Sequence, residues 1–289
     1  MSFAFQRSWG PKPSYPKVLE YKPDEECFYK IAGPCSVESK EQIFQVAEVV
    51  SKYGATHLRG GFFRAGTYPG KTFGFVPEEL IAAYQEAAHT YGLKNIIEVL
   101  DYSSESLNLV LKYADCLQVG ARSMQNYSLL RKLGATRKTI FLKRNPGSTL
   151  DEWLGAAEHL LMGGPCQPVL IERGGKVGLD HVRWDLSISM IPAVKAITRM
   201  PILVDGSHGT GRRDLVEPMT LAGIAAGADG YLVETHPNPE LSLSDKDQAI
   251  SLEAYAKLTR KIKYLVHGLE DGELAVTDHL TYKPDGGNA

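Results

Sequence analysis

The sequence has no long apolar run and no excess of charge of either sign. None of its apolar stretches approaches the roughly 20 residues that a helix needs to span a bilayer. The 32 Lys and Arg residues and the 34 Asp and Glu residues give a formal net charge of −2. Nucleic acid and membrane surfaces are therefore not expected as partners, because neither a basic footprint nor a spanning segment is present.

Cysteine is also scarce, and its four positions contain no CxxC pattern. The N-terminal residues MSFAFQRSWGPKPSYPK are rich in proline and aromatics and lack the apolar core of a signal peptide. In a chain without a leader, isolated cysteines are expected to be reduced thiols rather than a disulfide framework. The sequence therefore predicts a soluble, cytoplasmic protein whose free thiols are Cys27, Cys35, Cys116 and Cys166.

Short apolar runs typical of buried strands alternate with longer runs of helical spacing. The expected strands are 28–33, 56–61, 95–100, 116–120, 139–143, 168–172, 201–205 and 230–234. The expected helices are 41–54, 77–92 with Pro77 as the first helical residue, 104–113, 126–133, 150–163, 188–198, 213–226 and 248–265.

Eight strand–helix units predict an α/β fold, a single (β/α)8 TIM barrel. An open doubly wound sheet is the alternative, but GPCSVES after the first strand lacks the GxGxxG pattern of that fold. The expected division is an N-terminal extension (1–27), a catalytic barrel (28–266) and a short C-terminal tail (267–289).

Polar residues follow or end nearly every expected strand, where a barrel places its chemistry. Several are Arg or Lys, and such cations repel one another unless an anion neutralises them. An anionic substrate is therefore expected, and phosphate suits these side chains well. In strand order the residues are Cys35, Arg59, Glu98, Arg122, Lys143 with Arg144, Glu172 with Arg173, Asp205 with His208, and Glu234 with His236.

Three of these residues form a possible metal-binding set. Cys35, His208 and Glu234 end strands that become neighbours when a barrel closes, and an Asp that spacing does not select could join them. Thiolate, imidazole and carboxylate together suit a divalent ion such as Mn, Fe, Co or Zn. The alternative is a structural role, which is the commoner one for an isolated cysteine or histidine.

Seven ordered motifs resemble those of one enzyme family. IAGPCSVES, LRGG, VGARSMQN, FLKR, IERGG, DGSHGTGRRDLVEPM and VETHPNPELSLSD resemble 3-deoxy-D-arabino-heptulosonate 7-phosphate (DAHP) synthases over about residues 28–265. The most similar form is the short microbial type I enzyme related to KDO-8-phosphate synthase. The resemblance implies a metal-dependent barrel, a dimer or tetramer, that joins phosphoenolpyruvate (PEP) to an aldehyde and releases phosphate.

The resemblance also implies residue roles. It makes Asp245 the fourth metal ligand beside Cys35, His208 and Glu234, although SDKDQ could instead cap the last helix. It assigns the PEP phosphate to Arg122, Lys143 and Arg173, and the PEP carboxylate to Arg59. Glu98 and Asp205 are expected beside these cations or the metal-bound histidine.

One loop departs from the family pattern. After LRGG the family reads KPRTSP, where the Lys lies between the substrates and the Arg and Thr bind the acceptor phosphate. Here the run is FFRAGTYPGKTFGF, so Arg64 replaces the Lys and Gly66 replaces the Arg, whereas Thr67 is retained. Lys71 could restore some charge. In addition, Gly206 replaces the family's proline in DPSH.

Three hypotheses follow from this loop. In the first, the enzyme keeps PEP and metal but uses an acceptor aldehyde other than erythrose 4-phosphate. In the second, it is an ordinary DAHP synthase with a variant acceptor loop. In the third, it is an inactive homologue with a binding or regulatory role. The first is favoured over the second because every departure from the phosphate-binding pattern falls on the acceptor side.

Overall fold

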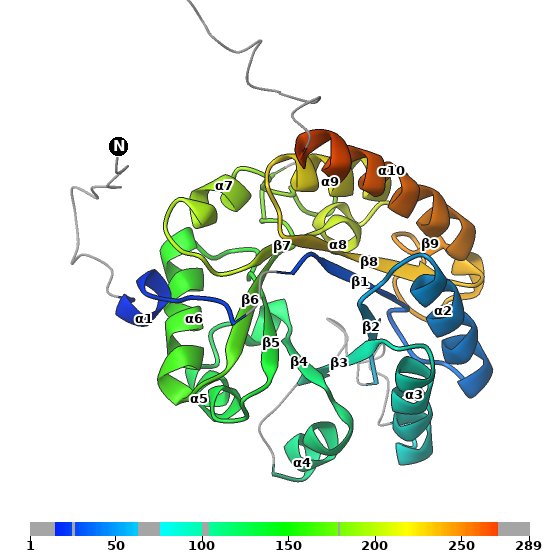
Figure 1. Cartoon of the computed structure of the whole chain (residues 1–289), viewed down its shortest axis with the longest axis horizontal. Helices are drawn as coiled ribbons and strands as arrows, with labels where there is room; N and C mark the ends of the chain where they lie inside the picture. The colour runs from blue at the N-terminus through cyan, green and yellow to red at the C-terminus, as the bar shows by residue number, and fades with distance from the viewer. Residues whose placement is uncertain (1–14, 25–26, 63–75, 100–103, 179, 271–289) are drawn as a thin grey trace, which may run out of the picture.

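Eight parallel strands of the described residues form a closed barrel (Figure 1). The computed structural model describes residues 15–24, 27–62, 76–99, 104–178 and 180–270. Each strand pairs with the next, and β8 pairs with β1 to close the ring, so the predicted TIM barrel is confirmed. The strands are β1 (Tyr29–Gly33), β2 (His57–Gly60), β3 (Lys94–Val99), β4 (Cys116–Val119), β5 (Thr139–Lys143), β6 (Gln167–Glu172), β7 (Ile202–Asp205) and β8 (Gly230–His236).

Helices lie outside the strands and connect them (Figure 1). Within the described residues, no helix combines the length and apolar character needed to cross a membrane. The helices are α1 (Pro16–Leu19), α2 (Lys40–Lys52), α3 (Glu78–Thr90), α4 (Ser104–Tyr113), η2 (Ala121–Ser123), α5 (Tyr127–Gly134), α6 (Leu150–Gly163), α7 (Met190–Lys195), α8 (Gly206–Thr210), α9 (Arg213–Ala225), η3 (Pro239–Leu241) and α10 (Leu252–Glu270).

Among the helix starts that differ from the prediction, two have clear local reasons. Pro77 is the N-cap of α3 rather than its first helical residue, because its ψ of 142° is extended. The last helix begins at Leu252 and not at 248, since Ile250–Ser251 form a short strand, β9, that pairs with β8. The Oγ of Ser251 accepts a hydrogen bond from the Ala254 amide, as an N-cap does.

Both faces of the barrel strands are buried, which explains their nearly continuous apolar runs. Alternate residues point inward and fill the barrel, whereas their neighbours pack against the helices. In β1, for example, Ile31 belongs to the inner cluster and Ala32 to the outer one. The inner cluster contains Tyr29, Ile31, Ile96, Cys116, Phe141, Val169, Ile171, Leu203 and Leu232.

The short helix α1 is attached to the barrel through α6. The Glu158 carboxylate accepts hydrogen bonds from the backbone amides of Lys17 (3.2 Å) and Val18 (2.9 Å). These amides belong to the first turn of α1, where backbone donors have no partner within the helix. Val18 is fully buried, and its carbonyl accepts from the Thr198 hydroxyl.

His57 is a buried titratable group among the inward-facing aromatic rings. Its ring lies 5.7 Å from Tyr29 and 5.6 Å from Phe141, and its Nδ1 contacts the Thr56 hydroxyl at 2.8 Å. Burial, and then Lys94, lower the pKa of His57 from 6.5 to about 4, although Asp115 acts in the opposite direction. The native protein therefore holds His57 neutral at pH values where the unfolded chain binds a proton.

This difference predicts a loss of stability in mild acid. The unfolded chain binds more protons below pH 6.5, so the free energy of unfolding should fall as pH decreases toward 4 and then level off. The full contribution of His57 is about 3 kcal/mol, from a shift of about two and a half pKa units. Urea unfolding of the wild type and of His57→Phe at pH 7 and pH 4.5 should show a smaller pH dependence in the variant. Equal pH dependence would contradict the prediction.

Candidate active site

The parallel direction of the strands brings the predicted site residues to one end of the barrel. Lys143 and Asp205 are the last residues of β5 and β7, whereas Arg59 and Glu234 lie near the ends of β2 and β8. Glu98, Glu172 and His236 lie at or near the last residue of their strands, and Asp245 lies in the loop beyond η3. The others, Cys35, Arg122, Arg144, Arg173 and His208, follow their strands within a few positions. This is the end at which TIM barrels carry out chemistry.

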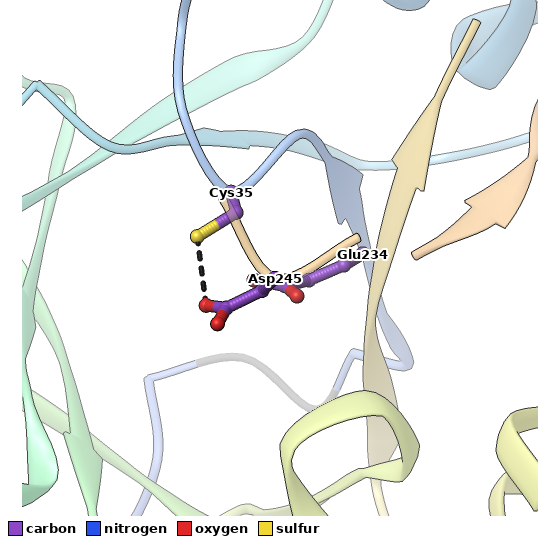
Figure 2. A group of neighbouring side chains, drawn as sticks. All are labelled: Cys35, Glu234 and Asp245. Atoms are coloured by element: carbon purple, nitrogen blue, oxygen red, sulfur yellow. Dashed lines mark hydrogen bonds between the residues drawn. The ribbon is translucent and has the colours of Figure 1, made fainter. Parts of the chain in front are cut away.

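Cys35, Glu234 and Asp245 form a compact group of possible metal ligands. One ligand atom from each lies within 4.8 Å of the others, and the Cys35 thiol donates to Asp245 Oδ2 at 3.0 Å. Figure 2 shows the sulfur facing the Asp245 carboxylate, with Glu234 beside them. A thiol with two carboxylates fits a borderline divalent cation better than a hard ion such as Mg²⁺.

Neighbouring contacts hold the two loops of this cluster together. The Ser36 and Ser244 hydroxyls are 2.7 Å apart, and the Glu38 carboxylate accepts from the Leu243 amide at 2.9 Å. Asp245 itself adopts a φ of 50°, a left-handed conformation that Asp tolerates better than most residues. The alternative that Asp245 caps the last helix is wrong, because that helix begins seven residues later, at Leu252.

His208 lies beside this cluster and contacts one of its members. Its Nε2 is 3.2 Å from Glu234 Oε1, and its Nδ1 is 2.8 Å from Asp205 Oδ2. Burial disfavours the imidazolium, but Asp205 and then Glu234 raise the pKa of His208 above its usual value. The ring is therefore fixed between two carboxylates, with one nitrogen directed toward the ligand group.

Glu234 has several partners besides the other members of the cluster. Its Oε1 is ion-paired with Arg59, its Oε2 accepts from Gln248 at 2.6 Å, and its amide donates to the Ser207 hydroxyl. Burial opposes ionisation of Glu234, but His208 and Arg59 hold its pKa well below the usual range. Sequence reasoning missed Gln248, because within SDKDQ only Asp245 was considered, as a metal ligand or as a cap of the last helix.

The Cys35 thiol is held in its neutral form in this environment. Burial, followed by Glu234 and Asp245, raises the pKa of Cys35 well above its usual value, although Arg59 opposes the rise. A bound divalent cation would supply the positive charge that a thiolate needs here.

Lys143 and Asp205 form a buried ion pair beside His208. Lys143 Nζ lies 2.9 Å from Asp205 Oδ2 and 3.3 Å from His208 Nδ1. Burial opposes ionisation of Asp205, yet His208 and Lys143 hold its pKa well below the usual range. Asp205 is also the N-cap of α8, and its side chain accepts from the His208 amide at 2.9 Å, which helps to position the imidazole. Asp205 thus contacts both a histidine and a cation, as expected from the sequence, and its role in the site stays a prediction.

Arg144 and Arg173 are adjacent in space but differ in how they are neutralised. Arg144 makes a two-pronged ion pair with Glu172, with N···O distances of 2.5 and 2.8 Å. Arg173 Nη1 is buried without a hydrogen-bond partner among the described residues, and the whole residue is 7% exposed. Burial lowers the pKa of Arg173, and Arg183 and Arg144 add to the effect, although Asp205 and Glu172 act in the opposite direction. Arg173 is therefore the cation best suited to receive an anion.

The other predicted residues lie around this region or outside the described chain. Arg122 is exposed in η2, directly after β4. Glu98 accepts from Gln118 at 2.8 Å and adds to the negative charge near Arg59. The predicted acceptor-side residues Arg64, Thr67 and Lys71 lie outside the described residues.

Gly206 has a structural explanation. A Cβ at this position would lie 2.2 Å from the Thr220 hydroxyl oxygen and 2.9 Å from the Val216 carbonyl. Thr220 in turn donates that hydroxyl to the Val216 carbonyl at 2.6 Å. The packing of α9 therefore requires glycine where the family pattern has proline.

Fold and site together define a class of protein: a (β/α)8 barrel whose catalytic end combines a thiol–carboxylate cluster with buried cations. The model of the DAHP synthetase I family matches residues 22–268. The chain belongs to this family, whose members are PEP-dependent enzymes that form C–C bonds.

Individual relatives agree with this assignment. A phospho-2-dehydro-3-deoxyheptonate aldolase of Thermotoga maritima is 38% identical over 91% of this chain and 77% of its own. A 2-dehydro-3-deoxyphosphooctonate aldolase of Bordetella petrii is 26% identical over 82% of this chain and 90% of its own. A crystal structure of the Thermotoga maritima DAHP synthase superposes with a TM-score of 0.80 at 39% identity, covering 86% of this chain and 72% of that one.

Proposed function

We propose that this protein condenses PEP with an aldehyde to give a 3-deoxy-2-keto acid and inorganic phosphate. The observation that carries the proposal concerns Arg173, at the same barrel end as the Cys35–Glu234–Asp245 cluster: among the described residues, one of its buried guanidinium N–H groups has no hydrogen-bond partner. A buried donor without an acceptor is costly, and a phosphate oxygen would satisfy it. The substrate of the family carries such a phosphate.

Arg122, Lys143 and Arg173 would bind the PEP phosphate, and Arg59 its carboxylate. Lys143 and Arg59 already have carboxylate partners, so they would share their remaining donors with the substrate. These fixed charges orient PEP and neutralise the leaving phosphate, which makes positioning and electrostatics the main sources of rate enhancement. In the overall reaction C3 of PEP forms a bond to the aldehyde carbon, water adds at C2, and the C2–O bond to phosphate breaks.

Cys35, Glu234, Asp245 and His208 would hold a divalent cation of the Mn, Fe, Co or Zn type. When bound, such an ion supplies Lewis acidity at the acceptor's carbonyl oxygen. Asp205 would keep His208 Nδ1 occupied, so that Nε2 is the nitrogen presented to the ligand group. Gln248 and Ser207 would fix the Glu234 side chain and backbone in the orientation that ligation needs.

The acceptor is proposed to differ from erythrose 4-phosphate. The loop FFRAGTYP lacks the Arg that clamps the acceptor phosphate in the family pattern, and Arg64 cannot replace a titratable Lys in proton transfer. An aldehyde without a terminal phosphate fits this loss. The second candidate, an ordinary DAHP synthase of the shikimate pathway, is favoured by the 38% identity to the Thermotoga enzyme.

An assay of phosphate release from PEP across a panel of aldehydes tests both candidates. We expect turnover that a chelator abolishes, with erythrose 4-phosphate a poorer acceptor than a non-phosphorylated aldehyde. If erythrose 4-phosphate is the best acceptor, the second candidate is correct. If no aldehyde supports PEP consumption and no metal binds, the protein is an inactive homologue.

A further inference from the structure

Trp184 lies against Arg173 and has a buried donor of its own. The Cζ atom of Arg173 is 5.4 Å from the centroid of the Trp184 ring, within the range of a cation–π contact. The indole Nε1–H of Trp184 is buried and, within the part of the chain that the structure describes, has no hydrogen-bond partner. Arg173, directly after β6, and Trp184, in the loop that follows, therefore each carry an N–H that has no acceptor among the described residues.

The backbone brings these two side chains together. Gly175 and Asp185 exchange both of their backbone hydrogen bonds, at 2.8 and 3.1 Å, which folds the loop after β6 back onto itself. Trp184 thereby packs across Gly174, where a Cβ would lie 2.8 Å from the Cβ of Trp184. Gly174 also has a φ of 92°, which side-chain-bearing residues rarely adopt, so the close approach depends on this glycine.

The charge around the indole favours an anion as the missing acceptor. Arg183 places its Cζ atom 5.7 Å from the same ring centroid and adds a second positive charge beside Arg173. The nearby carboxylate of Glu172 is already engaged by Arg144 and by the Gly174 amide. An indole N–H donates but does not accept, so it can bind an anion and cannot bind a cation.

We propose that Trp184 is a phosphate-binding residue of this site: its ring holds the Arg173 guanidinium in place, and its N–H donates to the same phosphate. This inference rests on the proposed function and adds a residue to its anion site. The ring limits the rotation of Arg173, and the added donor supplies a hydrogen bond that is stronger because its acceptor is charged.

Phosphate affinity of the full-length protein, measured by calorimetry with inorganic phosphate and with PEP, tests the proposal. Trp184→Phe keeps the ring but loses the N–H, and should weaken phosphate binding about tenfold. Trp184→Ala loses both and should weaken it more, with a raised KM for PEP and an unchanged KM for the acceptor. Phosphate should also change the tryptophan fluorescence of the wild type but not that of Trp184→Phe.

Trp153→Phe is the matched control, because it removes a buried indole donor whose partner is the Leu142 carbonyl in the core. It should bind phosphate as the wild type does. Wild-type affinity in Trp184→Phe would overturn the proposal, provided that Arg173→Ala binds weakly. If Arg173→Ala also binds phosphate normally, the anion site of the proposed function is itself wrong, so the two failures are distinguishable.

Discussion

Replacing Cys35 with alanine should abolish tight metal binding and reduce turnover to background. The thiol is the one sulfur donor of the cluster, and without it Glu234, Asp245 and the proposed ligand His208 form a weaker, harder site. We expect a loss of affinity larger than the roughly 10- to 100-fold caused by removing an outer-shell partner of a ligand. Titration with Co²⁺ measures this directly, because a cysteine ligand gives a sulfur-to-cobalt absorption band that should vanish in the variant.

Cys27→Ala is the control for this experiment. Cys27 is a free, exposed thiol that does not belong to the ligand group, so its loss should leave the cobalt spectrum unchanged. The Cys35→Ala variant should still fold, because the substitution removes a small side chain that makes one hydrogen bond, to the Asp245 carboxylate. A variant that binds Co²⁺ with wild-type affinity and turns over normally would refute the role of Cys35 as a ligand.

Arg144→Met should destabilise the protein by about 3–5 kcal/mol, because it leaves the Glu172 carboxylate buried without its counter-ion. Both residues are nearly inaccessible, with side chains 3% and 0% exposed. Adding Glu172→Gln should recover most of the loss, since the amide oxygen can still accept from the Gly174 amide. Urea and thermal unfolding of the two variants provide the measurement.

The exposed pair Lys112–Glu78 supplies the control. Its side chains are 61% and 48% exposed, and Lys112→Met should leave the free energy of unfolding nearly unchanged, because water screens an exposed pair. If Arg144→Met is as stable as the wild type, the buried Glu172 carboxylate does not need Arg144 as its counter-ion, and the prediction is wrong. If the double variant is no more stable than the single one, the cost does not come from the unpaired carboxylate.

The strands and most helices follow from local sequence. Runs such as TIFLK and PILVD combine apolar and β-branched residues over the length of one buried strand, and the structure places strands there. The short helix α8 was not predicted, because GSHGT has no apolar periodicity. It forms because Asp205 caps it and because Gly206 fits against Thr220, and both contacts depend on neighbouring elements.

Only some of the site residues could be predicted from strand positions. Barrel topology alone brings Cys35, His208 and Glu234 to one end of the barrel. Asp245 was predicted only from the family resemblance, because it lies in a loop, where no strand or helix periodicity indicates its position. Cys35 and Asp245 are 210 residues apart, and no local pattern joins them. Trp184 was missed for a similar reason, because its contact with Arg173 depends on a loop that folds back through two backbone hydrogen bonds.

The sequence by itself determined the barrel, the direction of its strands and the set of polar residues at their ends, because strand and helix patterns are local and the parallel order follows from them. Only the tertiary structure decided which charges neutralise one another. Arg144 is matched with Glu172 and Lys143 with Asp205, whereas Arg173 keeps an unpartnered N–H among the described residues. Ion pairing depends on distances of a few ångströms between side chains from different strands, which residue order does not encode locally.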